Sequence, residues 1–246
     1  MPVIPRRVTE RKTNRMIYAV SDIHGCLEKY EQLLEKIGFG PEDTLYVLGD
    51  VVDRGEDGMK ILADLADRRN VVFIRGNHDE SAWLILTKVL GKNGEIILPQ
   101  ASDALGAWLE DGGLPSMKQF FLELSEEKRE KVLDYIENGL NYCLLELNGK
   151  KYLLAHSIPE IEDFEKQGGT DGLDAMDFTF NETDYDVVYD PDVIMVSGHT
   201  PTLLIDKKSR GKIWKGNNHI AIDCGTFFDN PLGCICLDTG EEFYSE

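Results

Sequence analysis

The chain lacks three features that would each indicate a different class of protein. No apolar run exceeds six residues, whereas a helix that crosses a bilayer needs about 20. The five cysteines are odd in number and form no C-x-x-C pair, so we expect reduced thiols rather than a disulfide framework. Only 26 Lys and Arg stand against 45 Asp and Glu, and the net charge of −19 argues against a nucleic-acid polymer as partner. These absences favour a globular cytoplasmic protein with no membrane partner.

What is present is a regular alternation of structure in the first third of the chain. Between residues 16 and 80, short apolar strands alternate with amphipathic helices, which indicates an α/β fold with parallel strands and right-handed crossovers. Residues 81–138 have a mostly helical pattern. The second half returns to strands, with a hairpin predicted at Asn148-Gly149.

The length of the chain bounds its domain organisation. With 246 residues, it can form one domain with a substantial core. We predict a single domain over 1–246, in which 81–138 is a helical insertion. The basic stretch 1–15 has no apolar core of the kind a secretory leader needs, and we expect it to be flexible.

Five predicted strands end in side chains that commonly bind metals. Because ligands bind outside the carboxyl ends of strands in α/β sheets, five such ends predict one shared metal site. Carboxylate and amide oxygens together with imidazole nitrogens favour Mn first, with Fe or Zn as alternatives, over Ca or Mg. The candidate ligands at the strand ends are Asp22 and His24, Asp50, Asn77, His156, and His199.

Each of these residues alone has a simpler explanation. A strand-end Asp is more often a turn or helix cap, and a lone buried His is more often a hydrogen-bonded core residue. The combination is far more specific, because GDVVDRG at 49–55 and RGNHD at 75–79 lie about 20 residues apart and follow DIHG at 22–25. The combined pattern therefore predicts one shared metal site.

These motifs resemble those of the calcineurin-like metallophosphoesterases, and within them the phosphoprotein phosphatase family in its bacterial and phage form. The matching segments are DIHG, GDVVDRG, RGNHDE, AHS at 155–157 and GHTP at 198–201. WLEDGGLPSM at 108–117 is similar to a further segment of the bacterial members, with Asp111 where Asn is usual. The resemblance implies a four-layer α-β-β-α sandwich of two mixed sheets, with a dinuclear metal site at the carboxyl ends of the strands.

The resemblance also implies a division of roles. One divalent ion would lie on Asp22, His24 and Asp50, and the second on Asp50, Asn77, His156 and His199, with a bridging hydroxide as the nucleophile. His78 would protonate the leaving oxygen, and Asp53 would orient His78. Arg54 and Arg75 would bind phosphate oxygens, a task that suits a planar guanidinium.

Two departures bear on the substrate. Pro201 stands where the nuclease and phosphodiesterase branches have a second His, which favours phosphatase chemistry. The interval between His156 and His199 has no Arg, whereas the family usually supplies a phosphate-binding one, and its only cation is Lys166 among twelve acidic residues. We expect a phosphomonoesterase that acts on phosphoserine and phosphothreonine in proteins, because this acidic segment would repel a tetraphosphate if it lay near the site.

Two alternatives remain open. The first is a symmetrical bis(5'-nucleosyl)-tetraphosphatase, which hydrolyses the small phosphate ester diadenosine tetraphosphate and shares the same motifs. The second is a catalytically silent scaffold that keeps the fold, which the complete set of ligands argues against.

Overall fold

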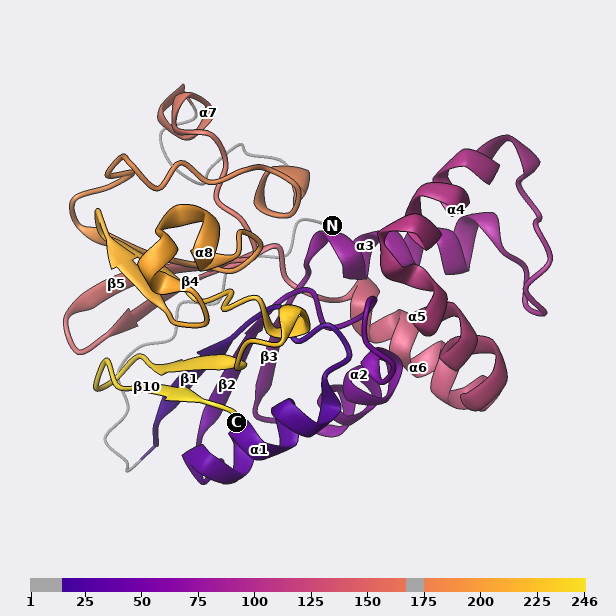
Figure 1. Cartoon of the computed structure of the whole chain (residues 1–246), viewed down its shortest axis with the longest axis horizontal. Coiled ribbons are helices and arrows are strands. Elements are labelled where there is room, and N and C mark those ends of the chain that lie inside the picture. Colours follow the sequence, from indigo (N-terminus) through magenta and orange to yellow (C-terminus); the bar gives the residue numbers. More distant parts are fainter. Residues whose placement is uncertain (1–14, 167–174) are drawn as a thin grey trace.

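A computed structural model of the protein describes residues 15–166 and 175–246 (Figure 1). Residues 1–15 were predicted to be flexible. Of these, residues 1–14 lie outside the described part. Within that part, no helix is both long and apolar enough to cross a membrane.

The first sheet contains the strands predicted in the first third of the chain. Its strands are β1 (Ile17–Val20), β2 (Thr44–Leu48), β3 (Val71–Ile74), β9 (Gly233–Cys236) and β10 (Glu242–Tyr244), in the order β10-β9-β1-β2-β3. β1, β2 and β3 are parallel, joined by α1 (Leu27–Ile37) and α2 (Gly58–Asp67), while β9 runs antiparallel to both β1 and β10. The predicted strand–helix alternation is confirmed.

The second sheet is also mixed. Its strands are β4 (Tyr142–Leu147), β5 (Lys150–Ala155), β6 (Val193–Ser197), β7 (Trp214–Gly216) and β8 (His219–Ala221), in the order β4-β5-β6-β8-β7. β5, β6 and β8 are parallel to one another. The predicted hairpin joins β4 and β5, and both Asn148 (φ 52°) and Gly149 (φ 73°) have the positive φ that a type I′ turn requires.

The two sheets pack face to face, and the alternation of side chains along each strand decides which ones meet. Ala19, Tyr46 and Leu48 point from the first sheet into a core shared with Leu154 and Val196 of the second. The opposite face of the first sheet packs under α1 and α2, in the indigo and purple part of Figure 1. This burial of apolar surface on both faces holds the two sets of strand ends together.

The outer face of the second sheet forms the remaining boundary of the sandwich. Leu153 and Met195 contact Phe164, Phe178 and Tyr189 of the acidic segment. That segment contributes two short helices, α7 (Ile161–Lys166) and the 3₁₀ turn Ala175–Phe178. The predicted α/β sandwich of two mixed sheets is therefore present, with a fourth layer that is largely irregular.

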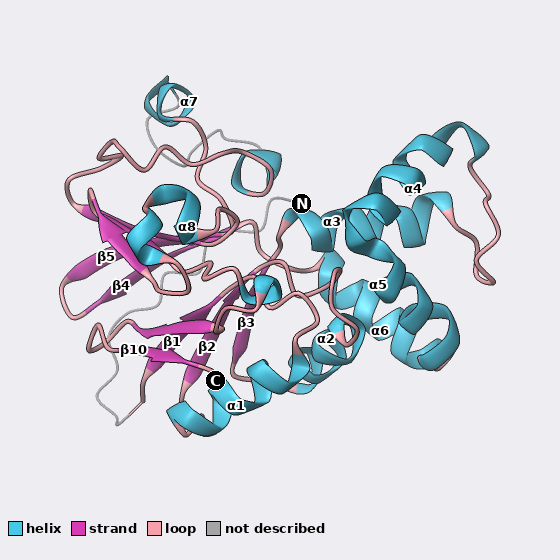
Figure 2. Ribbon diagram, in the orientation of Figure 1, coloured by secondary structure: helices cyan, strands magenta, loops and turns pink. Residues whose placement is uncertain are grey.

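Residues 81–138 form helices beside the first sheet, where α6 packs against α2 (Figure 2). The α-helices are α3 (Asn77–Leu84), α4 (Ser102–Trp108), α5 (Leu114–Lys118) and α6 (Glu126–Glu137), interrupted by π-helical turns. Ser125 caps α6 by accepting a hydrogen bond from the backbone of Lys128. After α6 the chain rejoins the edge of the first sheet, where Leu140 bridges Ile74. α8 (Thr202–Ile205) follows the last predicted ligand.

Candidate metal centre and active site

The carboxyl ends of strands from both sheets meet at one place. His156, after β5 of the second sheet, lies with Nε2 3.4 Å from Oδ1 of Asp50, after β2 of the first sheet. Nδ1 of the same ring lies 2.8 Å from the carbonyl oxygen of Leu48, the last residue of β2. The predicted convergence of strand ends from the two halves of the chain is therefore observed.

The backbone at these strand ends adopts a conformation that is uncommon for residues other than glycine. Ten such residues in the described part have positive φ, and six of them are predicted site residues. Asp, Asn and His tolerate the left-handed region better than most residues, and strained backbone of this kind clusters at functional sites. The six are Asp22, His24, Asp50, Asp53, Arg54 and His199.

Four predicted ligands form one tight group. Oδ1 of Asn77 lies 2.9 Å from Nε2 of His156 and 3.0 Å from Nδ1 of His199, and those two nitrogens are 3.1 Å apart. With Asp50, they place one carboxylate, one amide oxygen and two imidazoles around a common point. Burial is the largest influence on both imidazoles and lowers the pKa of His199 to about 4, so these rings are neutral near pH 7 and have the lone pair that a metal needs.

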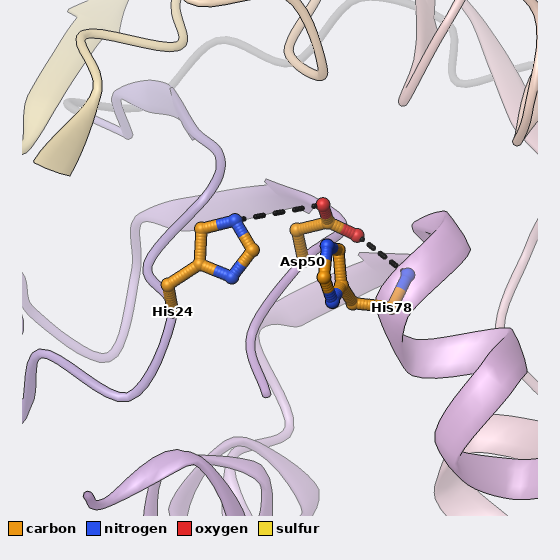
Figure 3. A group of neighbouring side chains, drawn as sticks. All are labelled: His24, Asp50 and His78. Atoms are coloured by element: carbon orange, nitrogen blue, oxygen red, sulfur yellow. Dashed lines mark hydrogen bonds and ion pairs between the residues drawn. The ribbon is translucent and has the colours of Figure 1, made fainter. Parts of the chain in front are cut away.

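A second group forms on the other side of Asp50. Oδ2 of Asp50 lies 3.6 Å from Nε2 of His24, and its Oδ1 accepts a hydrogen bond from the backbone N–H of His78 (Figure 3). The carboxylate thus lies between the two histidines and faces both groups of donors, as a bridging ligand must. Burial lowers the pKa of His24 to about 3, which keeps this imidazole neutral.

Asp22 lies beside the first group of donors rather than within either compact cluster. Its carboxylate accepts the backbone N–H of His199 at 3.1 Å. Burial, followed by the charges of Asp223 and Asp50, raises its pKa well above the usual range. Repulsion between buried carboxylates is what a divalent cation would relieve, so Asp22 fits a metal site electrostatically.

Hydrogen bonds from the opposite ring nitrogen orient two of the proposed imidazole ligands. Nδ1 of His24 lies 3.0 Å from the carbonyl oxygen of Val52, just as Nδ1 of His156 lies near that of Leu48. A carbonyl can only accept, so Nδ1 carries the hydrogen and Nε2 presents its lone pair to the site. The donor set and its orientation therefore fit two divalent cations.

The ring of His78 is oriented by a carboxylate that is not among the proposed ligands. Its Nδ1 lies 2.9 Å from Oδ2 of Asp53, which also accepts the indole N–H of Trp108 at 2.8 Å. Burial alone would lower the pKa of His78, but the charge of Asp50 and the hydrogen bond to Asp53 outweigh it and raise the pKa to about 9. The pKa of His78 is thus raised, whereas burial lowers the pKa values of the three imidazoles proposed as ligands.

The two predicted phosphate-binding arginines lie in different environments. Arg54 places Nη1 2.9 Å from Nε2 of His24 and Nη2 2.9 Å from Nε2 of His78, so its guanidinium lies over the site. Arg75 instead donates from Nη1 to Glu80 at 2.8 Å and from Nη2 to Asn141 at 2.7 Å. Its Nε is buried and has no hydrogen-bond partner. The guanidinium of Arg54 thus lies at the site, whereas that of Arg75 is hydrogen-bonded to Glu80 and Asn141.

Comparison with known proteins agrees with this geometry. A model of the calcineurin-like phosphoesterases matches residues 16–228. The chain belongs to this family. It is therefore a metallophosphoesterase, with two groups of donors that are candidate sites for metal ions.

Similar curated proteins of the calcineurin-like phosphoesterase family are named symmetrical bis(5'-nucleosyl)-tetraphosphatases. The chain is 39% identical to that of Pseudomonas syringae over 98 residues, which are 37% of this chain and 34% of the relative. It is 36% identical to that of Pseudomonas putida over 99 residues, with the same shares of the two chains. The matched segment thus spans about a third of the length of these relatives.

Two solved structures share the fold at low sequence identity. One, provisionally assigned as a diadenosine tetraphosphatase, has a TM-score of 0.64 at 17% identity, covering 98% of this chain and 97% of the other. A protein serine/threonine phosphatase from Saccharomyces cerevisiae has a TM-score of 0.60 at 15% identity, covering 93% and 74%. At these identities the likeness shows the fold alone.

One carboxylate of this calcineurin-like phosphoesterase site was missing from the sequence prediction. Asp223 follows β8, so a sixth strand ends in a carboxylate. It is buried, its Oδ1 accepts the backbone N–H of Gly225 at 2.8 Å, and burial raises its pKa to about 7. Ile220-Ala221-Ile222-Asp223 repeats the pattern of the five predicted ends, which was the signal that could have found it.

The helical insertion also contributes to the site. Besides Trp108, it supplies Ser116, whose Oγ accepts a hydrogen bond from the backbone N–H of Asp53. The carbonyl oxygen of Gly112 likewise accepts a hydrogen bond from the backbone N–H of Arg54. Asp111, at the position where Asn is usual, places Oδ2 3.6 Å from Nε2 of His78 and Oδ1 3.8 Å from Nη2 of Arg54. The insertion therefore forms one wall of the site and adds a carboxylate to it.

Proposed function

We propose that this metallophosphoesterase is a symmetrical dinucleoside tetraphosphatase, which splits diadenosine tetraphosphate into two molecules of ADP. The observation that carries the proposal is the local identity with proteins of that name, in a chain that contains the motifs DIHG, GDVVDRG and RGNHD. The reaction adds one water across the central P–O–P bond, so both products are nucleoside diphosphates.

The residues of the site have distinct tasks in this reaction. Two divalent ions, when bound, supply the Lewis acidity that activates water and stabilises charge at phosphorus. Arg54 is placed to bind phosphate oxygens at the same point, since its guanidinium lies between His24 and His78. His78, whose pKa is raised, is the proposed donor of a proton to the departing phosphate oxygen, and Asp53 orients its ring.

The acidic segment bears on the choice between a polyphosphate and a phosphoprotein substrate. Its described apolar residues pack on the outer face of the second sheet, through Phe164, Phe178 and Tyr189. Repulsion of a tetraphosphate depends on the assumption that this segment overhangs the site. The side chain of Lys166, its only cation, lies outside the described residues. Without that assumption, the motifs fit a dinucleotide as well as a phosphoprotein.

Assignment as a serine/threonine protein phosphatase, which the motifs alone favour, has weaker support. It rests on motifs that the tetraphosphatases share and on a likeness to the yeast phosphatase that concerns the fold alone. Local identity of 36–39% to named tetraphosphatases favours the alternative.

A substrate panel tests the proposal. The protein is freed of metal, reconstituted with Mn²⁺, and assayed with diadenosine tetraphosphate and with a phosphoserine peptide, and nucleotide products are separated by chromatography. We expect ADP as the sole nucleotide product and little release of phosphate from the peptide. Formation of ATP and AMP, or turnover of the peptide alone, would reject the proposal.

The Asp50→Asn variant is the matched control for metal dependence, because it removes the charge of the one carboxylate that faces both groups of donors. We expect turnover to fall by at least a hundredfold. Equal p-nitrophenyl phosphate hydrolysis by the variant and the wild type would instead support a scaffold whose apparent activity is contamination.

A further inference from the structure

Two exposed phenylalanines lie at the rim of the site. Phe227 and Phe228 belong to the 3₁₀ turn Thr226–Phe228, and their side chains are 41% and 56% exposed. Their rings meet edge to face, with centroids 5.8 Å apart. Large apolar side chains at a polar site call for an explanation, because exposing them costs hydrophobic free energy.

The pair is directly connected to the reacting centre. Cζ of Arg54 lies 6.0 Å from the centroid of Phe228, within the range of a cation–π contact. The same guanidinium lies 2.9 Å from His24 and from His78. A ligand with a phosphate on Arg54 would therefore have Phe228 within reach of the group attached to that phosphate.

The loop that carries the two rings is held rigidly. Nζ of Lys29 donates to the carbonyl oxygens of Thr226 at 2.9 Å and Asn230 at 2.8 Å, which fixes both ends of the turn. Nδ2 of Asn230 donates to the carbonyl of Gly225, whose N–H is bound by Asp223. The backbone that carries the two rings is thus held by hydrogen bonds before any ligand arrives, which lowers the entropy lost on binding.

We propose that Phe227 and Phe228 form a stacking surface for a nucleobase of the substrate. This rests on the proposed function and deepens it, because it assigns the part of the site that distinguishes a nucleotide from a bare polyphosphate. The adenine ring offers a flat aromatic face, and stacking on an aromatic side chain stabilises a bound base. In the symmetrical substrate, the base is separated from the cleaved bond by one ribose and one further phosphate.

Comparing the affinities for ADP and pyrophosphate distinguishes the contribution of the base from that of the phosphates. In the Mn²⁺-loaded protein, we expect Phe228→Ala to weaken ADP binding about tenfold, within the range for base–aromatic stacking, and pyrophosphate binding by less than twofold. Phe228→Trp should restore ADP binding, and ADP should quench the fluorescence of the new indole. Phe180→Ala is the matched control, because Phe180 is 39% exposed and lies on the acidic segment; its ADP affinity should equal that of the wild type.

Two outcomes overturn the inference. If Phe228→Ala weakens ADP and pyrophosphate equally, Phe228 acts only through Arg54. If wild-type protein binds ADP no better than pyrophosphate, there is no base site. Neither measurement needs turnover, so failure to hydrolyse diadenosine tetraphosphate would reject the proposed function, while the binding comparison would still decide on the stacking surface.

Discussion

Nδ1 of His78 lies 2.9 Å from Oδ2 of Asp53, and both side chains are buried. The indole of Trp108 donates to the same oxygen, so this carboxylate connects the start of α3 with the end of α4. The pair gives His78 a fixed ring orientation and helps to keep it protonated. Its position explains how one histidine in a group of neutral imidazoles can act as an acid.

Replacing His78 by Asn should slow the hydrolysis of poor leaving groups far more than that of good ones. An alkoxide must be protonated as it departs, and general acid catalysis contributes about 10²–10⁴-fold in such cases. We expect a loss of that size in kcat for glycerol phosphate and a loss of less than tenfold for p-nitrophenyl phosphate. Equal losses on both substrates, measured under the same Mn²⁺ loading, would remove His78 from the role of acid.

Replacing Asp111 by Asn should improve the binding of anionic substrates. The carboxylate is 63% exposed and lies near both Arg54 and His78, where it repels phosphate and competes for the guanidinium. Removing one charge at this distance in a solvated site is worth about 1 kcal/mol, so KM for diadenosine tetraphosphate should fall about fivefold.

Glu110→Gln provides the control for Asp111→Asn, because it makes the same change of charge at the neighbouring exposed residue. We expect its KM to stay within twofold of the wild-type value. If both substitutions lower KM equally, the effect reflects net charge rather than the contacts of Asp111.

Replacing Arg75 by Met should destabilise the fold. Arg75 and Glu80 form a mostly buried ion pair at 2.8 Å, and removing one partner leaves the other charge buried without compensation. Such losses cost about 3 kcal/mol. Arg68→Met, which breaks the more exposed pair with Asp64, should cost less than about 1 kcal/mol. Urea unfolding of both variants measures the difference.

The double variant Arg75→Met/Glu80→Leu sharpens this test. Because it removes both charges, it should recover part of the stability that the single variant loses. No recovery would mean that Arg75 stabilises the fold mainly through Asn141, to which it also donates.

The buried His219 should make the protein less stable in acid. Burial lowers its pKa to about 3, and its Nε2 lies 2.8 Å from Oγ of Ser197. Above pH 6.5 the ring is neutral in both the folded and the unfolded state. Below pH 6.5 the histidine of the unfolded chain becomes protonated, whereas the buried ring of the folded protein stays neutral. The free energy of unfolding therefore falls as pH decreases towards 3, by about 1.4 kcal/mol per pH unit.

Urea unfolding at pH 6.5 and 5.5 tests this dependence in the wild type and in His219→Gln. The other buried histidines contribute equally to both proteins and cancel in the comparison. We expect the wild type to lose about 1 kcal/mol more than the variant over this interval. Parallel losses would show that His219 does not govern acid sensitivity.

Local sequence pattern is sufficient to predict the first three strands and the helices between them, and it points to most of the candidate site residues. Apolar runs of four or five residues and amphipathic helices follow local periodicity, so β1, α1, β2, α2 and β3 could be predicted close to their observed bounds. The ligands could be predicted because they follow those strands directly. Asp50 is an example, placed by the strand before it and by Gly49, whose φ of 82° and contact with Gly76 leave no room for a side chain.

The partner that each side chain contacts depends on how the elements pack in three dimensions. Arg54 and Arg75 look equivalent in the sequence, yet one reaches His24 and His78 while Glu80 and Asn141 hold the other. The packing of the two sheets and the insertion determines the contacts between segments far apart in the chain. Local sequence pattern does not predict these contacts. The same packing brings Phe228 beside Arg54, 174 positions earlier in the chain.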